Sequence, residues 1–317
     1  MKKIALSTSI VLLVLGIAAG YLYRQNVRDL YVANFASQQA EADILAKRLD
    51  LTSEGKFLYK ASQPKLLSAT DFNKSCKTVQ KERSIVLGCY TYQNIYVYKV
   101  DDSRLDGVEE VTSAHELLHA VYDRMSQSEK QELNRQLILA ADSITDQHFV
   151  ELVSEYRKTE PEELENEIHS ILGTEISVLP SNLEDHYQKY FKDRQKIVAF
   201  SDRYQDAFKQ NESKIEAFDI QLASLKSQIE STNAELSRLE VTLSSRQKEL
   251  NRLRTNDVQA YNAQVALFNS LVAEYNSLIE TAKSLTNKYN DIVVSRNAIA
   301  KNQADLSQQL DSNYQTR

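Results

Sequence analysis

Hydrophobic positions in the second half of the chain recur at alternating steps of three and four residues, the spacing of a coiled coil. The first series keeps one heptad frame, with Thr232 and Arg246 as polar exceptions: Ile215, Phe218, Leu222, Leu225, Ile229, Leu236, Leu239, Leu243, Leu250 and Leu253. The second series keeps a frame displaced by one residue: Val258, Tyr261, Val265, Phe268, Val272, Tyr275, Ile279, Ala282, Thr286, Tyr289 and Val293. Both series predict helices that bury an apolar seam.

Two arrangements account for the displacement between the frames. Residues 200–254 and 257–310 can form antiparallel arms joined by a tight turn, for which Asn256 and Asp257 are suitable caps. Alternatively, one continuous helix carries a skip residue and needs a partner chain. The arms are nearly equal in length and can cover each other, so we predict an antiparallel coiled-coil hairpin over residues 200–310. Its surface is also a candidate for binding a protein partner or for self-association.

A β signal occurs between Ser84 and Val100, where β-branched and aromatic residues are frequent. The run from Ile85 to Tyr92, followed by Gln93-Asn94 and then Ile95 to Val100, predicts a hairpin. Residues 25–83 mix a short amphipathic helix, Leu30 to Leu49, with a polar stretch, and they show no recognisable chemistry.

The amino terminus contains an apolar stretch, Ile4 to Tyr23, without any charged residue. About twenty such residues are long enough to cross a bilayer, so residues 1–24 predict a transmembrane signal-anchor. The rest of the chain then lies outside the cytoplasmic membrane. The alternative is a cleaved signal peptide with Ala18-Ala19-Gly20 as its small-residue site, which gives a secreted protein.

Composition excludes a nucleic-acid-binding protein. The net charge is −6, and the sequence has neither a basic patch nor a glycine-rich phosphate loop. The chain has two cysteines, Cys76 and Cys89, which an exported domain can join in a disulfide and a cytoplasmic one would leave free.

The stretch from His115 to His119 reads H-E-x-x-H. Apolar residues at helical spacing surround it and predict a buried helix: Val108, Val111, Ala114, Leu118, Val121 and Tyr122. Residues four apart share one helix face, so both imidazoles can bind one Zn²⁺ cofactor. Glu116 lies beside them, where it can act as the general base for a zinc-bound water.

A catalytic zinc needs a third protein ligand. The metzincin pattern requires glycine at position 122 and histidine at position 125, and Tyr122 and Met125 exclude it. Downstream, residues 166–170 read N-E-x-x-S, and here the chain resembles the gluzincins, the thermolysin-like metallopeptidases. The resemblance implies that Glu167 is the third ligand. The alternatives for this ligand are His169 and Glu163.

The gluzincin pattern has an aspartate where this chain has Ile171, so another group must orient a ligand imidazole. The candidates are Glu175, Glu109 and Glu110. The resemblance also implies a tyrosine or histidine that stabilises the oxyanion. His186 and Tyr187 are the first candidates for this catalytic role, and Tyr156 is a further one.

These patterns predict a mainly α fold with a small β-hairpin or sheet, an α+β zincin-like domain flanked by an N-terminal transmembrane helix and a long C-terminal coiled-coil hairpin. The predicted parts are the anchor (1–24), a membrane-proximal helical region (25–83), a zinc metallopeptidase domain (84–195) and the hairpin (200–310). The expected function is hydrolysis of peptide bonds in a peptide or protein substrate. The alternative is a noncatalytic cell-envelope scaffold that carries a degenerate peptidase domain.

Overall fold

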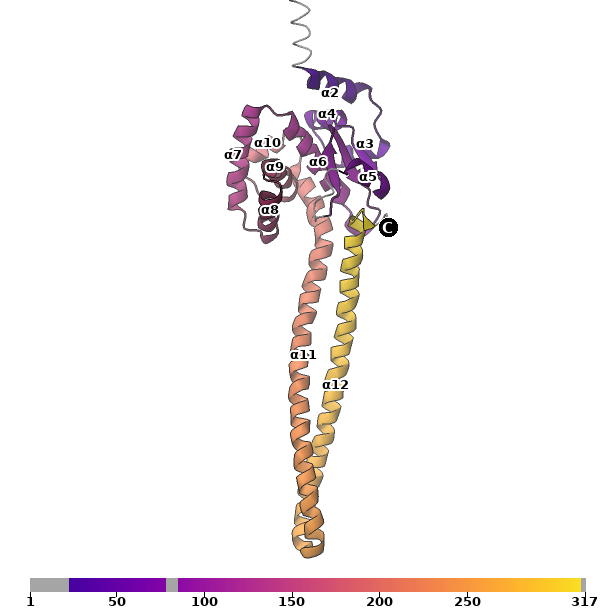
Figure 1. The fold of residues 1–317 in the computed structure, drawn as a ribbon, viewed down its shortest axis with the longest axis vertical. Helices are drawn as coiled ribbons and strands as arrows, with labels where there is room; N and C mark the ends of the chain where they lie inside the picture. Colours follow the sequence, from indigo (N-terminus) through magenta and orange to yellow (C-terminus); the bar gives the residue numbers. More distant parts are fainter. Residues whose placement is uncertain (1–22, 78–84, 315–317) are drawn as a thin grey trace, which may run out of the picture. The chain divides into compact units, whose positions relative to one another are not determined.

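The computed structural model describes residues 23–77 and 85–314, which fall into two units (Figure 1). Unit 1 comprises the described residues up to Ala207 and those from Leu306 onward. Unit 2 comprises Phe208–Asp305. Most of the described residues are helical, and the strands form one small sheet in unit 1.

Short helices and short strands alternate along unit 1 before the first long helix begins. The elements in chain order are α2 (Arg24–Phe35), α3 (Ala40–Arg48), α4 (Ser53–Ala61), β1 (Lys65–Leu67), α5 (Ala69–Ser75), β2 (Gly88–Thr91), β3 (Asn94–Tyr98), a 3-10 turn (Ser103–Leu105), α6 (Val108–Arg124), α7 (Gln127–Ser143), α8 (Gln147–Thr159), α9 (Leu164–Glu175), α10 (Ser181–Tyr187), α11 (Arg194–Asn256) and α12 (Val258–Leu310).

The sheet has three strands in the order β1-β3-β2. β2 and β3 are antiparallel neighbours within the predicted stretch 84–100, whereas β1 runs parallel to β3. The hairpin turns at Tyr92 and Gln93, one residue earlier than expected. Both residues have positive φ, 49° and 62°, which matches the two-residue turn that fits the twist of a hairpin. Residues 85–87, predicted as strand, are not in one.

Helix α6 lies between the sheet and α9 and forms the centre of unit 1 (Figure 1). Ala114, Leu117 and Leu118 are completely buried in its middle. Each fully buried leucine stabilises the fold by about 1.5–3 kcal/mol relative to an exposed one. The position of α6, and of any polar side chain on it, is therefore set by the core.

Unit 2 is a hairpin of α11 and α12. Asp257 alone separates the two helices, and its Oδ1 accepts a hydrogen bond from Ala260 N at 3.0 Å, as an N-cap does. The arms pair through side chains: Arg296 Nε donates to Asp219 Oδ1 at 2.7 Å. The chain thus has the hairpin and not the continuous helix.

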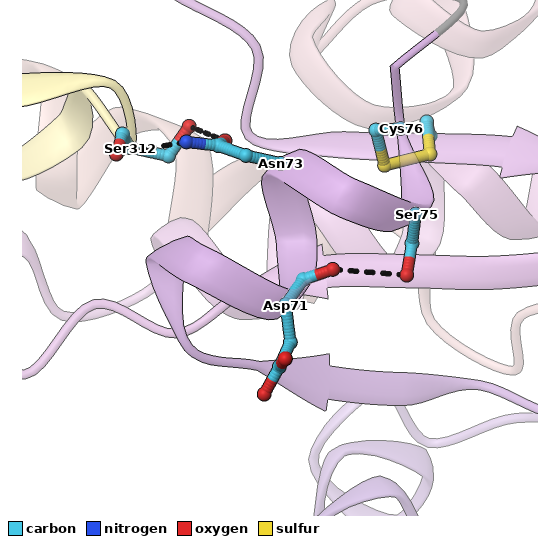
Figure 2. The surroundings of a disulfide bond; sticks show 6 residues. Asp71, Asn73, Ser75, Cys76 and Ser312 are labelled. Carbon is cyan, nitrogen blue, oxygen red and sulfur yellow. Dashed lines mark hydrogen bonds between the residues drawn. A yellow bond between two sulfur atoms is a disulfide. The ribbon is translucent and has the colours of Figure 1, made fainter. Parts of the chain in front are cut away.

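The segment after α12 lies against α5 in unit 1. Leu306 and Leu310, in the last turns of α12, are buried. Asn73 Nδ2 donates to the backbone oxygen of Ser312 at 3.1 Å, and Ser312 Oγ donates to Asn73 Oδ1 at 2.7 Å (Figure 2). Close by, Cys76 at the end of α5 forms a disulfide with Cys89 of β2. Of the two states predicted for these cysteines, the structure has the disulfide.

The predicted transmembrane helix has no support in the structure. In residues 23–77 and 85–314, no helix is both long enough and apolar enough to cross a membrane. The apolar stretch behind the prediction lies outside the described residues, apart from Tyr23 at its end. The fold class is corrected accordingly to a mostly helical chain with a small three-stranded sheet.

The region 25–83 also differs from its prediction. The single helix expected over Leu30 to Leu49 is two helices, α2 and α3, interrupted at residues 36–39. Residues 65–67 form β1, which the sequence analysis did not predict. Three residues cannot show the alternation by which strands are recognised, and only pairing with β3 makes them a strand.

Candidate metal centre

Two imidazoles lie one turn apart on α6. The ring centroids of His115 and His119 are 4.8 Å apart, and their side chains are 21 % and 10 % exposed. Both rings line one cavity of unit 1. Because the neighbouring apolar residues of α6 hold the helix in the core, the backbone positions from which these rings extend are set by the core.

Glu167 reaches the same point from α9. Its Oε2 lies 3.5 Å from His115 Nε2, and its Oε1 lies 3.5 Å from His119 Nε2. One donor atom from each of the three residues lies within 4.8 Å of the other two. The structure therefore brings together the three residues that were predicted from the sequence to be the metal ligands.

Gly173 allows the close approach of α9 to α6 that this requires. A Cβ at this position would lie 2.3 Å from Leu118 Cδ1 and 2.7 Å from Tyr187 Cε1. Neither atom can move freely, because both side chains are fully buried. A larger residue would push α9 outward, and Glu167 would move with it.

The state of Glu167 fits a divalent cation. Burial raises its pKa, but electrostatic attraction to His119, hydrogen bonding and attraction to His115 and a hydrogen bond from Tyr156 outweigh burial and lower the pKa to about 2. The carboxylate is therefore ionised at neutral pH, and its Oε2 is buried without a hydrogen-bond donor. A charged buried oxygen is costly unless a cation or donor compensates it. Tetrahedral zinc places neighbouring ligand atoms about 3.4 Å apart, close to the 3.5 Å between Glu167 and each of the two histidines.

Asn166 orients one of the two imidazoles. Its Oδ1 lies 3.0 Å from His119 Nδ1, and its Nδ2 donates to Glu163 Oε2 at 3.1 Å. The amide oxygen can only accept, so Nδ1 of His119 carries a proton, and in the neutral, metal-binding form of the ring the lone pair is on Nε2, which lies 3.5 Å from Glu167 Oε1. This role of Asn166 was not predicted from the sequence, although Asn166 is the first residue of the N-E-x-x-S motif.

The three carboxylates predicted as candidates for orienting a ligand imidazole, Glu109, Glu110 and Glu175, have other neighbours. Glu109 accepts a hydrogen bond from Val100 N at 2.9 Å. Glu110 pairs with Arg48 at 2.8 Å. Glu175 lines the cavity and contacts Gln205. None of these contacts is to a ligand imidazole.

Glu116 is buried and lines the same cavity. It lies against Gly88, the first residue of β2, where a Cβ would come within 2.5 Å of Glu116 Oε1 and 2.6 Å of Thr112 Cγ2. Glycine at position 88 thus makes room for the carboxylate between helix and strand. Glu116 was predicted as the general base, and its location in the cavity beside β2 is compatible with that role.

The cavity has a volume of about 1100 Å³. Residues 85–93, which include β2, line it together with Tyr156, Asn166 and Glu167. β2 is an edge strand, since among the described residues it pairs only with β3. The cavity therefore combines the histidine-carboxylate cluster with a strand that has one unpaired edge.

The structure does not bring His186 and Tyr187 to the cavity. His186 Nε2 lies 2.9 Å from His169 Nε2, and the Tyr187 hydroxyl donates to the backbone oxygen of His169 at 2.7 Å. Burial and the nearby Lys189 lower the pKa of His186 to about 4, and burial raises the pKa of Tyr187. Neither residue lines the cavity, and both are buried in the packing between α9 and α10.

The structure also shows the positions of the two alternative third ligands and of Tyr156. His169, an alternative ligand, is buried and engaged with His186. Glu163, the other alternative, accepts from Asn166. Tyr156 lines the cavity and contacts Glu167, so it is the aromatic candidate for the oxyanion that does lie at the cluster.

Comparisons with known proteins give no relative. No protein-family model, no curated protein sequence and no solved structure matches the chain. The resemblance to gluzincins consequently depends on the two motifs.

Proposed function

We propose that this chain is a zinc-dependent metallopeptidase. The observation that carries the proposal is the convergence of His115, His119 and Glu167 on one point of a large cavity, with Glu116 next to them. Two imidazoles and a carboxylate are the ligand set of a catalytic zinc that keeps one position for water. Coordination by all three would also compensate the charge of the buried Glu167 oxygen.

The residues of the cavity then have distinct tasks. A bound zinc supplies a Lewis acid that lowers the pKa of a coordinated water. Glu116 accepts the proton of the attacking water and transfers it to the leaving amine. Tyr156 can donate a hydrogen bond to the carbonyl oxygen as negative charge develops there. Asn166 keeps the Nε2 lone pair of His119 available for the metal.

The edge of β2 suits an extended peptide. Main-chain N–H and C=O groups of an unpaired strand edge can pair with a substrate as an additional strand. Residues 88–91 line the cavity next to Glu116, so a peptide paired there would pass the cluster. A peptide or unfolded protein is therefore the proposed substrate class.

Metal analysis of the purified chain, together with cleavage of an unfolded protein, tests the proposal. We expect one zinc per chain, lost in His115→Ala. Glu116→Gln should retain zinc but lose roughly 10²- to 10⁴-fold in cleavage rate, the usual contribution of a general base. Glu165→Gln is the matched control, because Glu165 lines the same cavity outside the cluster and should leave both properties unchanged.

Two outcomes contradict the proposal. A metal-free chain that binds no added zinc would support the noncatalytic scaffold instead. Full activity of Glu116→Gln would show that Glu116 is not the general base, and this would contradict the proposed mechanism.

A further inference from the structure

Helix α2 has its polar side turned toward the protein. Asp29 is only 4 % exposed and forms an ion pair with Arg124 of α6, whose Nε lies 2.8 Å from Oδ2. Arg28 donates to the backbone oxygen of Ala61 at the end of α4. Gln25 accepts a hydrogen bond from Gln93 in the hairpin turn. Polar contacts to three separate elements thus fix the orientation of α2 on unit 1.

The opposite side of α2 is apolar and exposed. We call it the outer face; its residues and exposures are Tyr23 62 %, Val27 59 %, Leu30 55 %, Tyr31 65 % and Phe35 77 %. Tyr23, Val27, Tyr31 and Phe35 recur every four residues and Leu30 lies three beyond Val27, so the five form one stripe along the helix. A helix on a water-exposed surface has the reverse arrangement, with its apolar stripe toward the core. An exposed apolar stripe of this kind marks an interaction surface.

The sequence before α2 indicates what covers the outer face. No charged residue occurs between Ile4 and Tyr23, and this apolar stretch ends at the first residue of the face. The face also carries two tyrosines, whose apolar rings and polar hydroxyls suit the boundary between lipid chains and headgroups. The first charged residue of the chain after the stretch is Arg24, which can attract anionic headgroups.

We propose that the outer face of α2 rests in the interfacial layer of a lipid bilayer, with the helix lying along the membrane surface. At about 1.5 Å per residue the twelve residues of α2 extend about 18 Å, enough for all five side chains to enter one leaflet. The polar contacts to α4, α6 and the hairpin hold unit 1 against that surface. This inference does not depend on the metal centre.

The chain contains no tryptophan, so a single introduced tryptophan reports on its own surroundings. Tyr31→Trp places the probe on the outer face. Leu139→Trp is the matched control, because Leu139 is 72 % exposed on α7 of the same unit. Both full-length variants are mixed with vesicles of phosphatidylcholine and a minor fraction of phosphatidylglycerol, with or without bromine on the upper acyl carbons.

For Tyr31→Trp we expect emission that shifts to the blue with vesicles and is quenched by the brominated lipid, about twofold or more beyond the control. Equal quenching at both positions, or none at position 31, overturns the proposal. A blue shift that is present without vesicles also overturns it, because another part of the chain or a second copy then covers the face.

Discussion

At the scale of single residues, the candidate metal centre depends on an amide that is not one of its three proposed ligands. Asn166 joins His119 to Glu163 and so selects which imidazole nitrogen keeps its lone pair. A histidine free to exchange tautomers presents the wrong nitrogen part of the time. Asn166 is therefore a positioning residue, and its effect should be on metal affinity rather than on folding.

Replacing Asn166 by alanine should weaken zinc binding by roughly 10- to 100-fold, the usual effect of losing a group that orients a ligand. Competition with a chromophoric chelator measures this affinity directly. Asn134→Ala is the matched control, since Asn134 lines the same cavity but bonds to Tyr122. Unchanged zinc affinity in Asn166→Ala, or an equal loss in Asn134→Ala, would contradict the role assigned to Asn166.

The sequence could predict the histidine pair but not its surroundings. His115 and His119 share a face because four residues make about one turn, and that follows from the sequence alone. The bond between Asn166 and His119 joins residues 47 positions apart, and no local spacing reports it. By residue type, His186 and Tyr187 are as suitable as Tyr156 for stabilising the oxyanion. Only the structure shows that they pack between α10 and α9 and do not line the cavity.

At the scale of elements, the disulfide ties α5 to β2, the strand that lines the cavity. Cys76 and Cys89 are 0 % and 3 % exposed and pack with Phe72 and Tyr98. The bridge spans 13 residues. Closing a loop of this length restricts the unfolded chain and stabilises the fold by about 3 kcal/mol in the chain-entropy picture.

The double variant Cys76→Ala with Cys89→Ala should therefore lower the free energy of unfolding by about 2–4 kcal/mol, measured by urea denaturation. Alanine is chosen because serine would bury two hydroxyl groups. Ser75→Ala is the control: its exposed hydroxyl bonds to Asp71 O at the end of α5 (Figure 2), and the change should stay within about 0.5 kcal/mol. A double variant as stable as the parent would show that the bridge contributes nothing.

The elements that the sequence predicted well are those with a long periodic pattern. Helix α6 and both arms of the hairpin repeat an apolar position over many turns, and the structure has helices there. The break between α2 and α3 and the strand β1 escaped prediction for a common reason. Each is decided by contacts with distant residues, as when Gln39, just before α3, accepts a hydrogen bond from Leu66 N.

At the scale of the molecule, the sequence left open whether the helices of the second half pack against each other within one chain or against a second chain. Asn256-Asp257 could be a turn or the site of a skip residue, because either one explains why the heptad frames on its two sides differ by one residue. The structure has a turn, and the arms of unit 2 bond to each other through Asp219 and Arg296. The two alternatives predict different neighbours for position 219.

Cross-linking distinguishes the hairpin from the continuous helix. In the hairpin, cysteines in place of Asp219 and Arg296 are neighbours in one chain, and both sites are accessible, with side chains 49 % and 34 % exposed. A short bis-maleimide should therefore join them within single chains, giving a band of altered mobility at monomer mass at every protein concentration. Asp219→Cys with Lys283→Cys is the control, because position 283 lies about 20 Å from position 296 along α12 and is out of reach. Cross-linked dimers that increase with protein concentration would instead indicate the continuous helix, and the second half of this chain would then need a partner to bury its apolar seam.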